Sequence, residues 1–357
     1  MNFRQTTEPE SKKQKISIFR RFENSTVITV LISFIIAITT IQFTTGMLTG
    51  DFSIPTFITP NNVFNILMQI SVAGILAIGM TVVMVSRGID LSVGMLVSLI
   101  TILMAKSVTD WGLSLPVTLL LGLTVSVLLE TILGYIISRT HVEPFIITLG
   151  GMIMFQGIAL LLCGSREVRL ANGEFDFLKF NIIAGAKFDG LNLIIPIYVI
   201  IFVIVAAIIW AIMKFTRYGR WIYCVGSNPE AAYLSGINVK NVKMSVYSLN
   251  GVMVFLAAAA LNSRLGVALI SGGTGLEIDA IAAVVIGGVA MSGGKGNAWG
   301  AFFGAILLGC IGNAMSMLRL PGEWQYIIKG LVIILSIIAG TITNFISKKI
   351  KHKVQIS

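Results

Sequence analysis

The stretch Gly226–Lys240, GSNPEAAYLSGINVK, is the longest polar interruption in the second half of a chain that is otherwise strongly apolar. It carries the signals of a short helix. Asn228 can cap the helix, Pro229 suits its first position, and Gly236 can end it in the left-handed conformation. Glu230 places a carboxylate at the positive end of the helix dipole. A helix of about two turns is too short to be stable alone in water, so we expect it to pack against another surface.

The composition around this stretch places the chain in a membrane. It has 357 residues, of which 55% are hydrophobic and only 12% are charged. A soluble globular domain covers itself with polar groups, and this sequence has too few of them for its size. The net charge of +10 fits basic residues that touch anionic lipid on the cytoplasmic side, so it needs no nucleic-acid partner. We therefore expect a multi-pass protein of the cell membrane.

Ten apolar stretches are candidates for membrane crossings, since each helical crossing needs roughly 20 apolar residues. They are 27–48, 62–85, 91–105, 116–138, 145–163, 192–213, 243–262, 276–292, 298–318 and 325–346. The third stretch is short and directly follows Arg87-Gly88-Ile89-Asp90, which predicts a tight polar turn or a broken helix there. The expected fold is an all-α, polytopic membrane helix bundle of about ten transmembrane helices.

The basic residues orient this bundle through the positive-inside rule. With the N-terminus in the cytoplasm, 18 of the 26 Lys and Arg residues fall in cytoplasmic segments and 7 in external ones, while Lys329 lies within the last span. This asymmetry predicts cytoplasmic N- and C-termini, with tails over 1–26 and 347–357 and a transmembrane domain over 27–346. The polar loop 214–242, which contains the predicted short helix, then faces the cytoplasm.

Two blocks of four spans suggest an internal repeat. Spans two to five and spans seven to ten enter the membrane from opposite sides. In each block the second span begins at a glycine-rich break followed by carboxylates, Gly88-Ile89-Asp90 in one and Gly272–Asp279 in the other. Inverted repeats with broken helices recur in transporters. We therefore expect possible inverted four-helix repeats, and an amphipathic segment on the outer face within the external loop 164–191.

Three motifs resemble the permeases of ATP-binding cassette (ABC) importers. Glu230-Ala231-Ala232, followed after three residues by Gly236, resembles their cytoplasmic EAA loop. Gly79-Met80-Thr81 leading into Arg87–Gly94, and the later stretch Gly273–Gly296, are similar to motifs of the monosaccharide permeases of the ribose/galactose type. The resemblance runs from about residue 60 to the end, with three long motifs in the same order. It is to the branched-chain amino acid/ribose permease superfamily.

The resemblance implies a permease domain that works with separate subunits. In that family the EAA loop is a coupling helix that sits in a cleft of a cytoplasmic ATPase, which binds ATP and Mg²⁺. A second permease chain, identical or homologous, and an external solute-binding protein complete the importer. The solute would be a monosaccharide of the ribose, galactose or xylose kind. The residues carried over to ATPase coupling are Asn228, Glu230, Ala231, Ala232 and Gly236.

The sequence predicts that this chain is not an enzyme and binds no cofactor itself. Ser292–Gly296, SGGKG, is similar to a phosphate loop, but Val289 stands where the first glycine of that motif belongs. Gly296 stands where a Ser or Thr must bind magnesium, so the stretch is no Walker motif. The three cysteines are scattered, and neither histidine has the spacing of a metal ligand, so we expect no metal site.

Several polar residues in or beside the spans are candidates for a translocation pathway or gate, because ionisable groups within a membrane are often functional. They are Arg87, Asp90, Asn65, Gln69, Glu277 and Asp279. Each has a structural alternative. Asp90 can cap the third span, and Glu277 and Asp279 can stabilise a helix start. Amides such as Asn250, Asn262, Asn313 and Gln325 can bind sugar hydroxyls or tie helices to each other.

Other functions stay open at this point. The solute could be a furanone-type signal, a nucleoside or a branched-chain amino acid, because the external stretches 46–60 and 164–191 depart from the family's usual pattern. An ion-coupled secondary transporter could use Asp90, Glu277 and Asp279 as ion ligands, but it would have no ATPase for the EAA helix to contact. A membrane scaffold would not need carboxylates and glycine breaks at the ends of its spans.

Overall fold

The computed structural model describes residues 59–164, 166–170, 175, 187–188, 191–192, 196–318, 321–332, 334 and 338. The predicted first span and both predicted tails lie outside these residues. So do most of the last predicted span, the stretch 46–58 and most of the external loop 164–191. The prediction of ten spans with both termini in the cytoplasm therefore stays a prediction.

Helices make up most of the described chain. The α-helices are α2 (Pro60–Val85), α3 (Val93–Thr109), α4 (Leu115–Arg139), α5 (Pro144–Cys163), α6 (Ile197–Phe215), α7 (Arg217–Ser227), α8 (Pro229–Leu234), α9 (Val239–Leu265), α10 (Leu276–Ile286) and α11 (Ala298–Met317), with helical residues again at 322–332. Among the described residues, six helices are long and apolar enough to cross a membrane: α2, α4, α5, α6, α9 and α11. Helix α3 is apolar but shorter.

The eighth predicted span, 276–292, forms a helix over only its first part. Helix α10 begins after Gly275, which has φ 84°, and it ends at Gly287. Before it, β4 (Val267–Ala268) leads into the short 3-10 helix η2 (Ile270–Gly273). Ser98 of α3 fixes η2, because its hydroxyl donates to Ile270 O and accepts from Gly273 N. The glycine break expected at this point is therefore present, and it leaves α10 too short to cross a bilayer alone.

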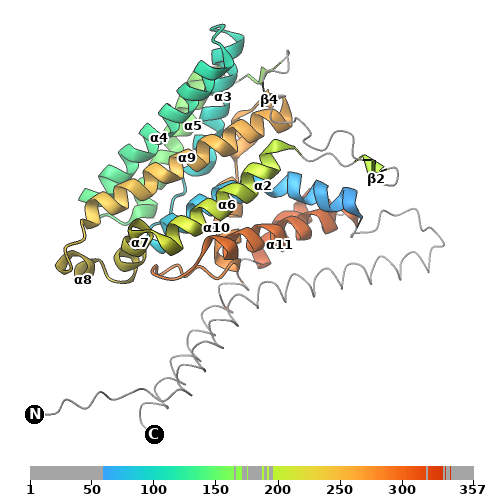
Figure 1. Cartoon of the computed structure of the whole chain (residues 1–357). Helices are drawn as coiled ribbons and strands as arrows, with labels where there is room; N and C mark the ends of the chain where they lie inside the picture. Colours follow the sequence, from blue (N-terminus) through green and yellow to red (C-terminus); the bar gives the residue numbers. More distant parts are fainter. Residues whose placement is uncertain are drawn as a thin grey trace, which may run out of the picture.

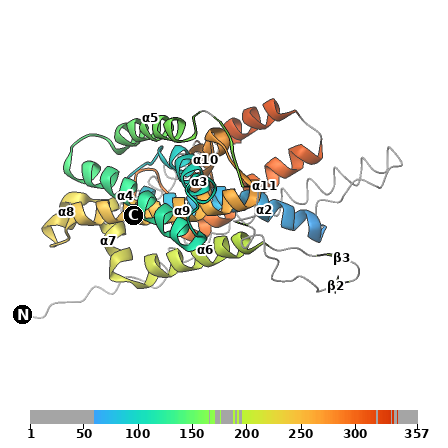
Figure 2. The ribbon, with the colours of Figure 1, turned by 90° about the horizontal axis from the view of Figure 1, so that it is seen from above.

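Helix α2 is the centre of the bundle. It packs against α6, α9, α10 and α11, while α3 packs against α4, α5 and α9. In its most apolar part 78% of α2 is buried within the chain, against 22% for α5. Figure 2 shows α5 and α6 on opposite outer sides, with α2, α3, α9 and α10 between them. The central helices thus contact other helices of the chain, while the outer ones leave most of their side chains exposed.

The two ends of the bundle differ in structure. Helices α7 and α8 lie together at one end, which we call the α8 end (Figure 1). At the opposite end, called the strand end, β1 (Val168–Arg169) pairs antiparallel with β4, Val168 opposite Ala268. The hairpin of β2 (Lys187–Phe188) and β3 (Leu191–Asn192) also lies there. If the chain spans a membrane, these ends face opposite sides of it.

Candidate functional site

Helix α8 has the caps that its sequence predicts. The side-chain oxygen of Asn228 accepts hydrogen bonds from the backbone N–H groups of Glu230 (3.0 Å) and Ala231 (3.1 Å). Glu230 lies in the first turn, where its carboxylate meets the positive end of the helix dipole. Gly236 follows the helix with φ 81°. The local signals of this stretch are thus sufficient to define both of its ends.

Most side chains of α8 are exposed and do not pack against the rest of the chain. Ala232 is buried, but Tyr233 and Leu234 are 73% and 85% exposed. Glu230 and Ala231 are exposed as well. A six-residue helix with two large apolar side chains at its tip gains little from its own chain. This exposed tip is therefore suited to contact another protein.

Three backbone segments meet directly beneath α8. Gly226 near the end of α7 lies so close to the carbonyl oxygen of Val85, at the end of α2, that an added Cβ atom would overlap it. The same carbonyl accepts a hydrogen bond of 2.8 Å from Gly294 N. We call this meeting point, formed by Val85, Gly226 and Gly294, the α8 anchor. It joins the segment that carries α8 to the central helix of the bundle.

Two side chains reinforce the anchor. Arg87, whose φ of 70° is unusual for a residue other than glycine, donates from Nε to Ser292 O at 3.1 Å. Tyr223 of α7 donates its hydroxyl to Gly296 O at 2.6 Å. Burial raises the pKa of the Tyr223 phenol, so it stays a neutral donor. Arg87, predicted as a pathway or gate residue, thus lies in the turn after α2, where it contacts the loop that follows α10.

Asp90 lies one turn further into the bundle and is completely buried. Its Oδ1 accepts from the backbone N–H (2.9 Å) and hydroxyl (2.6 Å) of Ser92, at the start of α3. Its Oδ2 accepts from the side-chain amide of Asn250 on α9, also at 2.9 Å. Asp90 therefore stabilises the turn before α3, whereas the N-cap of that helix is Ser92, which makes no side-chain capping hydrogen bond. No ion pair with Arg87 occurs among the described residues, so the long-range partner is an amide.

The two carboxylates of α10 point to different sides, as their spacing predicts. Glu277 is buried against Gly94 of α3, and its Oε1 accepts from Gly275 N at 3.3 Å. Asp279 forms an ion pair of 3.0 Å with Lys329, in the helical segment 322–332. Sequence reasoning missed this partner, because nothing local connects positions 50 residues apart. In the part of the chain that the structure describes, no group of three or more metal-binding side chains occurs.

Most of the candidate amides tie helices together. Asn262 donates to Thr101 O at 3.1 Å, and Asn313 exchanges two 2.9 Å hydrogen bonds with Asn62. Asn65 and Gln69, in contrast, are exposed on α2. Among the α2 amides whose side chains the structure describes, these two are exposed, while Asn62 is buried.

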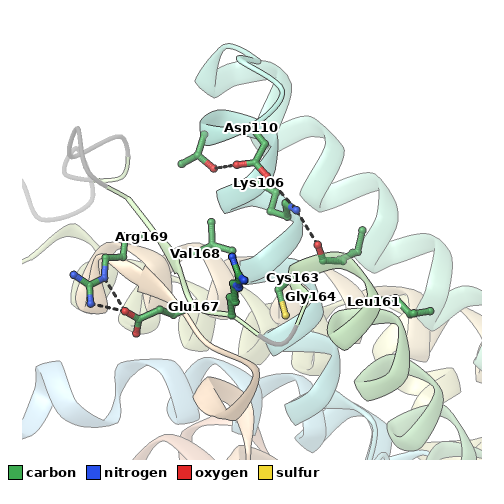
Figure 3. A pocket seen from close by; sticks show the side chains of 11 residues that line it. Lys106, Asp110, Leu161, Cys163, Gly164, Glu167, Val168 and Arg169 are labelled. Carbon is green, nitrogen blue, oxygen red and sulfur yellow. Dashed lines mark hydrogen bonds and ion pairs between the residues drawn. The ribbon is translucent and has the colours of Figure 1, made fainter.

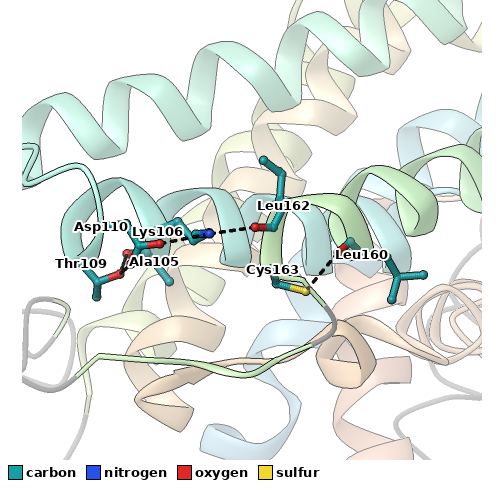
Figure 4. A network of polar contacts seen from close by, with 7 residues as sticks. All are labelled: Ala105, Lys106, Thr109, Asp110, Leu160, Leu162 and Cys163. Atoms are coloured by element: carbon teal, nitrogen blue, oxygen red, sulfur yellow. Dashed lines mark hydrogen bonds and ion pairs between the residues drawn. The ribbon is translucent and has the colours of Figure 1, made fainter.

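The strand end carries a shallow hollow of about 650 Å³ between the end of α3, the end of α5 and the segment 166–169 (Figure 3). Lys106 connects its walls by donating to Leu162 O at 2.9 Å and pairing with Asp110 at 3.0 Å (Figure 4). Hydrogen bonds from Lys106 and Thr109 lower the pKa of Asp110. Arg169 pairs with Glu167 on the other side. The hollow is thus lined by charged and polar groups as well as by apolar ones.

Comparisons with known proteins find sugar-transport permeases among the relatives of this chain. The ribose import permease protein RbsC of Bacillus subtilis (strain 168) is 35% identical over 80% of this chain and 86% of the relative. RbsC of Escherichia coli (strain K12) is 38% identical over 80% and 87%. The xylose transport system permease protein XylH of Haemophilus influenzae is 32% identical over 79% and 89%. No solved structure matches this chain.

A family model covers most of the described structure. Residues 62–337 match the permease component of branched-chain amino acid transport systems. The match and the six long apolar helices confirm the multi-pass membrane protein and the resemblance that the sequence predicted. This chain therefore belongs to the family of branched-chain amino acid transport system permease components.

Proposed function

We propose that this chain is the membrane-spanning permease subunit of an ABC importer for a monosaccharide of the ribose or xylose kind. The observation that carries the proposal is the capped, exposed helix α8 in a chain whose relatives are named ribose import and xylose transport permeases. A short helix with an apolar tip needs a partner surface. A cytoplasmic ATPase subunit supplies it, and an external solute-binding protein and a second permease chain complete the complex.

In this proposal the energy of ATP enters through α8. ATP and Mg²⁺ bind in the partner ATPase, and this chain binds no cofactor. Asn228 and Gly236 shape α8, and the buried Ala232 packs it against its own chain. The exposed Glu230 and Ala231, with the tip formed by Tyr233 and Leu234, contact the ATPase. When ATP draws the two domains of a tandem ATPase together, the two α8 helices of the permease dimer follow. The α8 anchor, where Gly226 presses on Val85, passes this displacement to α2, the central helix of the bundle.

The translocation pathway is proposed to follow α2 and the broken span of α10. Asn65 and Gln69 are exposed amides that can bind sugar hydroxyls. Glu277 lies at the start of α10, where η2 replaces regular helix. Asp90 and Asp279 hold neighbouring helices in place through Asn250 and Lys329. Arg87 lies at the cytoplasmic exit, beside the α8 anchor.

The proposed topology has ten spans with both termini in the cytoplasm. It comprises a tail over 1–26, a permease domain over 27–346 with the coupling loop 214–242, and a tail over 347–357, with inverted four-helix repeats. The separation of α8 and the strand pairs to opposite ends of the bundle supports this arrangement. The excess of basic residues in the segments on the α8 side supports its orientation.

Labelling of single cysteines in intact cells tests this topology. In a variant without Cys163, Cys224 and Cys310, Ser114→Cys is expected to react with an impermeant thiol reagent, because Ser114 is exposed at the strand end and its side chain caps nothing. Leu234→Cys, 85% exposed on α8, should react only after the membrane is permeabilised. The opposite pattern would reverse the proposed orientation.

The energy source is tested by reconstituting the chain alone. In proteoliposomes with an imposed proton or sodium gradient, the lone chain is expected to accumulate no ribose or xylose, because the ATPase that drives it is missing. Adding the ATPase subunit, the binding protein and ATP should start accumulation. Gradient-driven uptake by the chain alone would instead favour an ion-coupled secondary transporter.

A further inference from the structure

Glu130 is a buried carboxyl group that the proposed function does not use. It lies in the middle of α4 and is 0% exposed, although most of that helix faces outward. Neither of its carboxyl oxygens has a hydrogen-bond partner. A carboxylate that is buried without a partner is among the most costly arrangements in a protein. The protonation state of Glu130 in the folded protein therefore needs an explanation.

The groups that face Glu130 come from two other parts of the bundle. Asp90, in the turn between α2 and α3, accepts a hydrogen bond from Asn250 of α9, and the next residue, Gly251, packs against Glu130. Tyr247 of α9 faces both carboxyl groups. The backbones of α4 and α9 are unusually close here, since a Cβ added at Gly251 would lie 3.1 Å from that of Glu130. Among the described residues, no Lys, Arg or His forms an ion pair with this cluster of Asp90, Ser92, Glu130 and Tyr247.

The cluster has more hydrogen-bond acceptors than donors. Asp90 already receives two bonds from Ser92 and one from Asn250. Both oxygens of Glu130 and the side-chain oxygen of Asn250 receive none. The hydroxyl of Tyr247 is also buried and has no hydrogen-bond partner. If Asp90 and Glu130 were both ionised, their two negative charges would repel each other, and the surplus of hydrogen-bond acceptors would remain.

We propose that Glu130 carries a proton in the folded protein and donates it to Asp90, so that the two side chains share one negative charge. One proton relieves both problems, because it removes a charge and adds the missing donor. The shared proton ties α4 to the turn that follows Val85 and Arg87, and thus to the α8 anchor. Glu130 is in this way a positioning residue, and its link to transport rests on the proposed function.

Infrared difference spectroscopy of the purified, membrane-reconstituted chain tests the proton directly. At neutral pH the wild type is expected to show the carbonyl stretch of a protonated carboxylic acid, shifted in D₂O, and Glu130→Gln should remove it. Glu143→Gln is the matched control, because Glu143 is exposed and its loss should leave this band unchanged. If the band is absent from the wild type, or survives Glu130→Gln, the proposal fails.

Paired substitutions test the positioning role. Glutamine keeps the shape of a neutral glutamic acid and can still donate to Asp90, whereas leucine cannot. We expect Glu130→Gln to retain the unfolding temperature and transport within about two-fold, and Glu130→Leu to lower both, with transport falling about ten-fold for a loss near 1.4 kcal/mol. If glutamine is as damaging as leucine, and sodium ions stabilise the wild type, the cluster holds a metal cation instead. The spectrum and the unfolding temperature need no transport, so they remain decisive even if the importer function is wrong.

Discussion

Gly226→Ala is expected to reduce binding-protein-dependent transport at least ten-fold, although it adds a single methyl group. The added Cβ would overlap the carbonyl oxygen of Val85 and lie 2.8 Å from Gly294 N, and both contacts are with backbone atoms. A side chain can rotate away from an overlap, but these contacts are with backbone atoms, so the three backbone segments would have to move apart. Overpacking of this kind costs about 1–3 kcal/mol. The hydrogen bond between Gly294 and Val85 would be stretched or lost.

The measurement compares transport, ATP hydrolysis and unfolding temperature in one reconstituted complex. Gly150→Ala is the control, because a Cβ at Gly150 on α5 meets nothing within 4 Å in this chain. We expect the control to match the wild type in all three. For Gly226→Ala we expect a lowered unfolding temperature and ATP hydrolysis that no longer responds to the binding protein. Normal coupling in Gly226→Ala would show that the close approach at the α8 anchor transmits nothing.

Local sequence signals predict the short elements of this fold well. The cap at Asn228 and the left-handed turn at Gly236 depend on side chains within a few residues, so both could be identified without the structure. The break before α10 was also predictable, because a run of glycines disfavours helix. The end of α10 was not predictable, because the apolar stretch continues beyond Gly287. Only the close backbone contact with Gly300 shows why a glycine is needed there.

Long-range partners could not be found in the same way. Asp90 looks from the sequence like a helix cap, but it bonds to Ser92 in the turn before α3 and to Asn250, 160 positions away. The ion pair between Lys329 and Asp279 could not be predicted either, because the two residues are 50 positions apart in the sequence. Hydropathy treats each span separately, whereas these contacts depend on which faces of the helices meet. The candidate site was therefore predicted as a set of residues, while the pairs within it required the folded bundle.

Gly236→Val is expected to uncouple ATP hydrolysis from transport while the protein remains in the membrane. Gly236 has φ 81°, which valine adopts only at a cost of about 1–2 kcal/mol or more, because its Cβ approaches the following carbonyl. The turn after α8 would relax towards negative φ and change the direction in which the chain enters α9. Because Leu234 and Tyr233 form the exposed tip, their position on the ATPase would shift with it.

Gly112→Val is a closely matched control for this change. Gly112 also has positive φ, 63°, and at both positions an added Cβ meets nothing within 4 Å, so only backbone strain differs from the wild type. It lies between α3 and α4 at the strand end, away from the ATPase. We expect both variants to lose a similar amount of stability. Only Gly236→Val should lose stimulated ATP hydrolysis and transport by about ten-fold, since a misdirected α8 contacts its partner poorly. Equal activities of the two variants, measured at matched membrane levels, would mean that α8 is only a linker between α7 and α9.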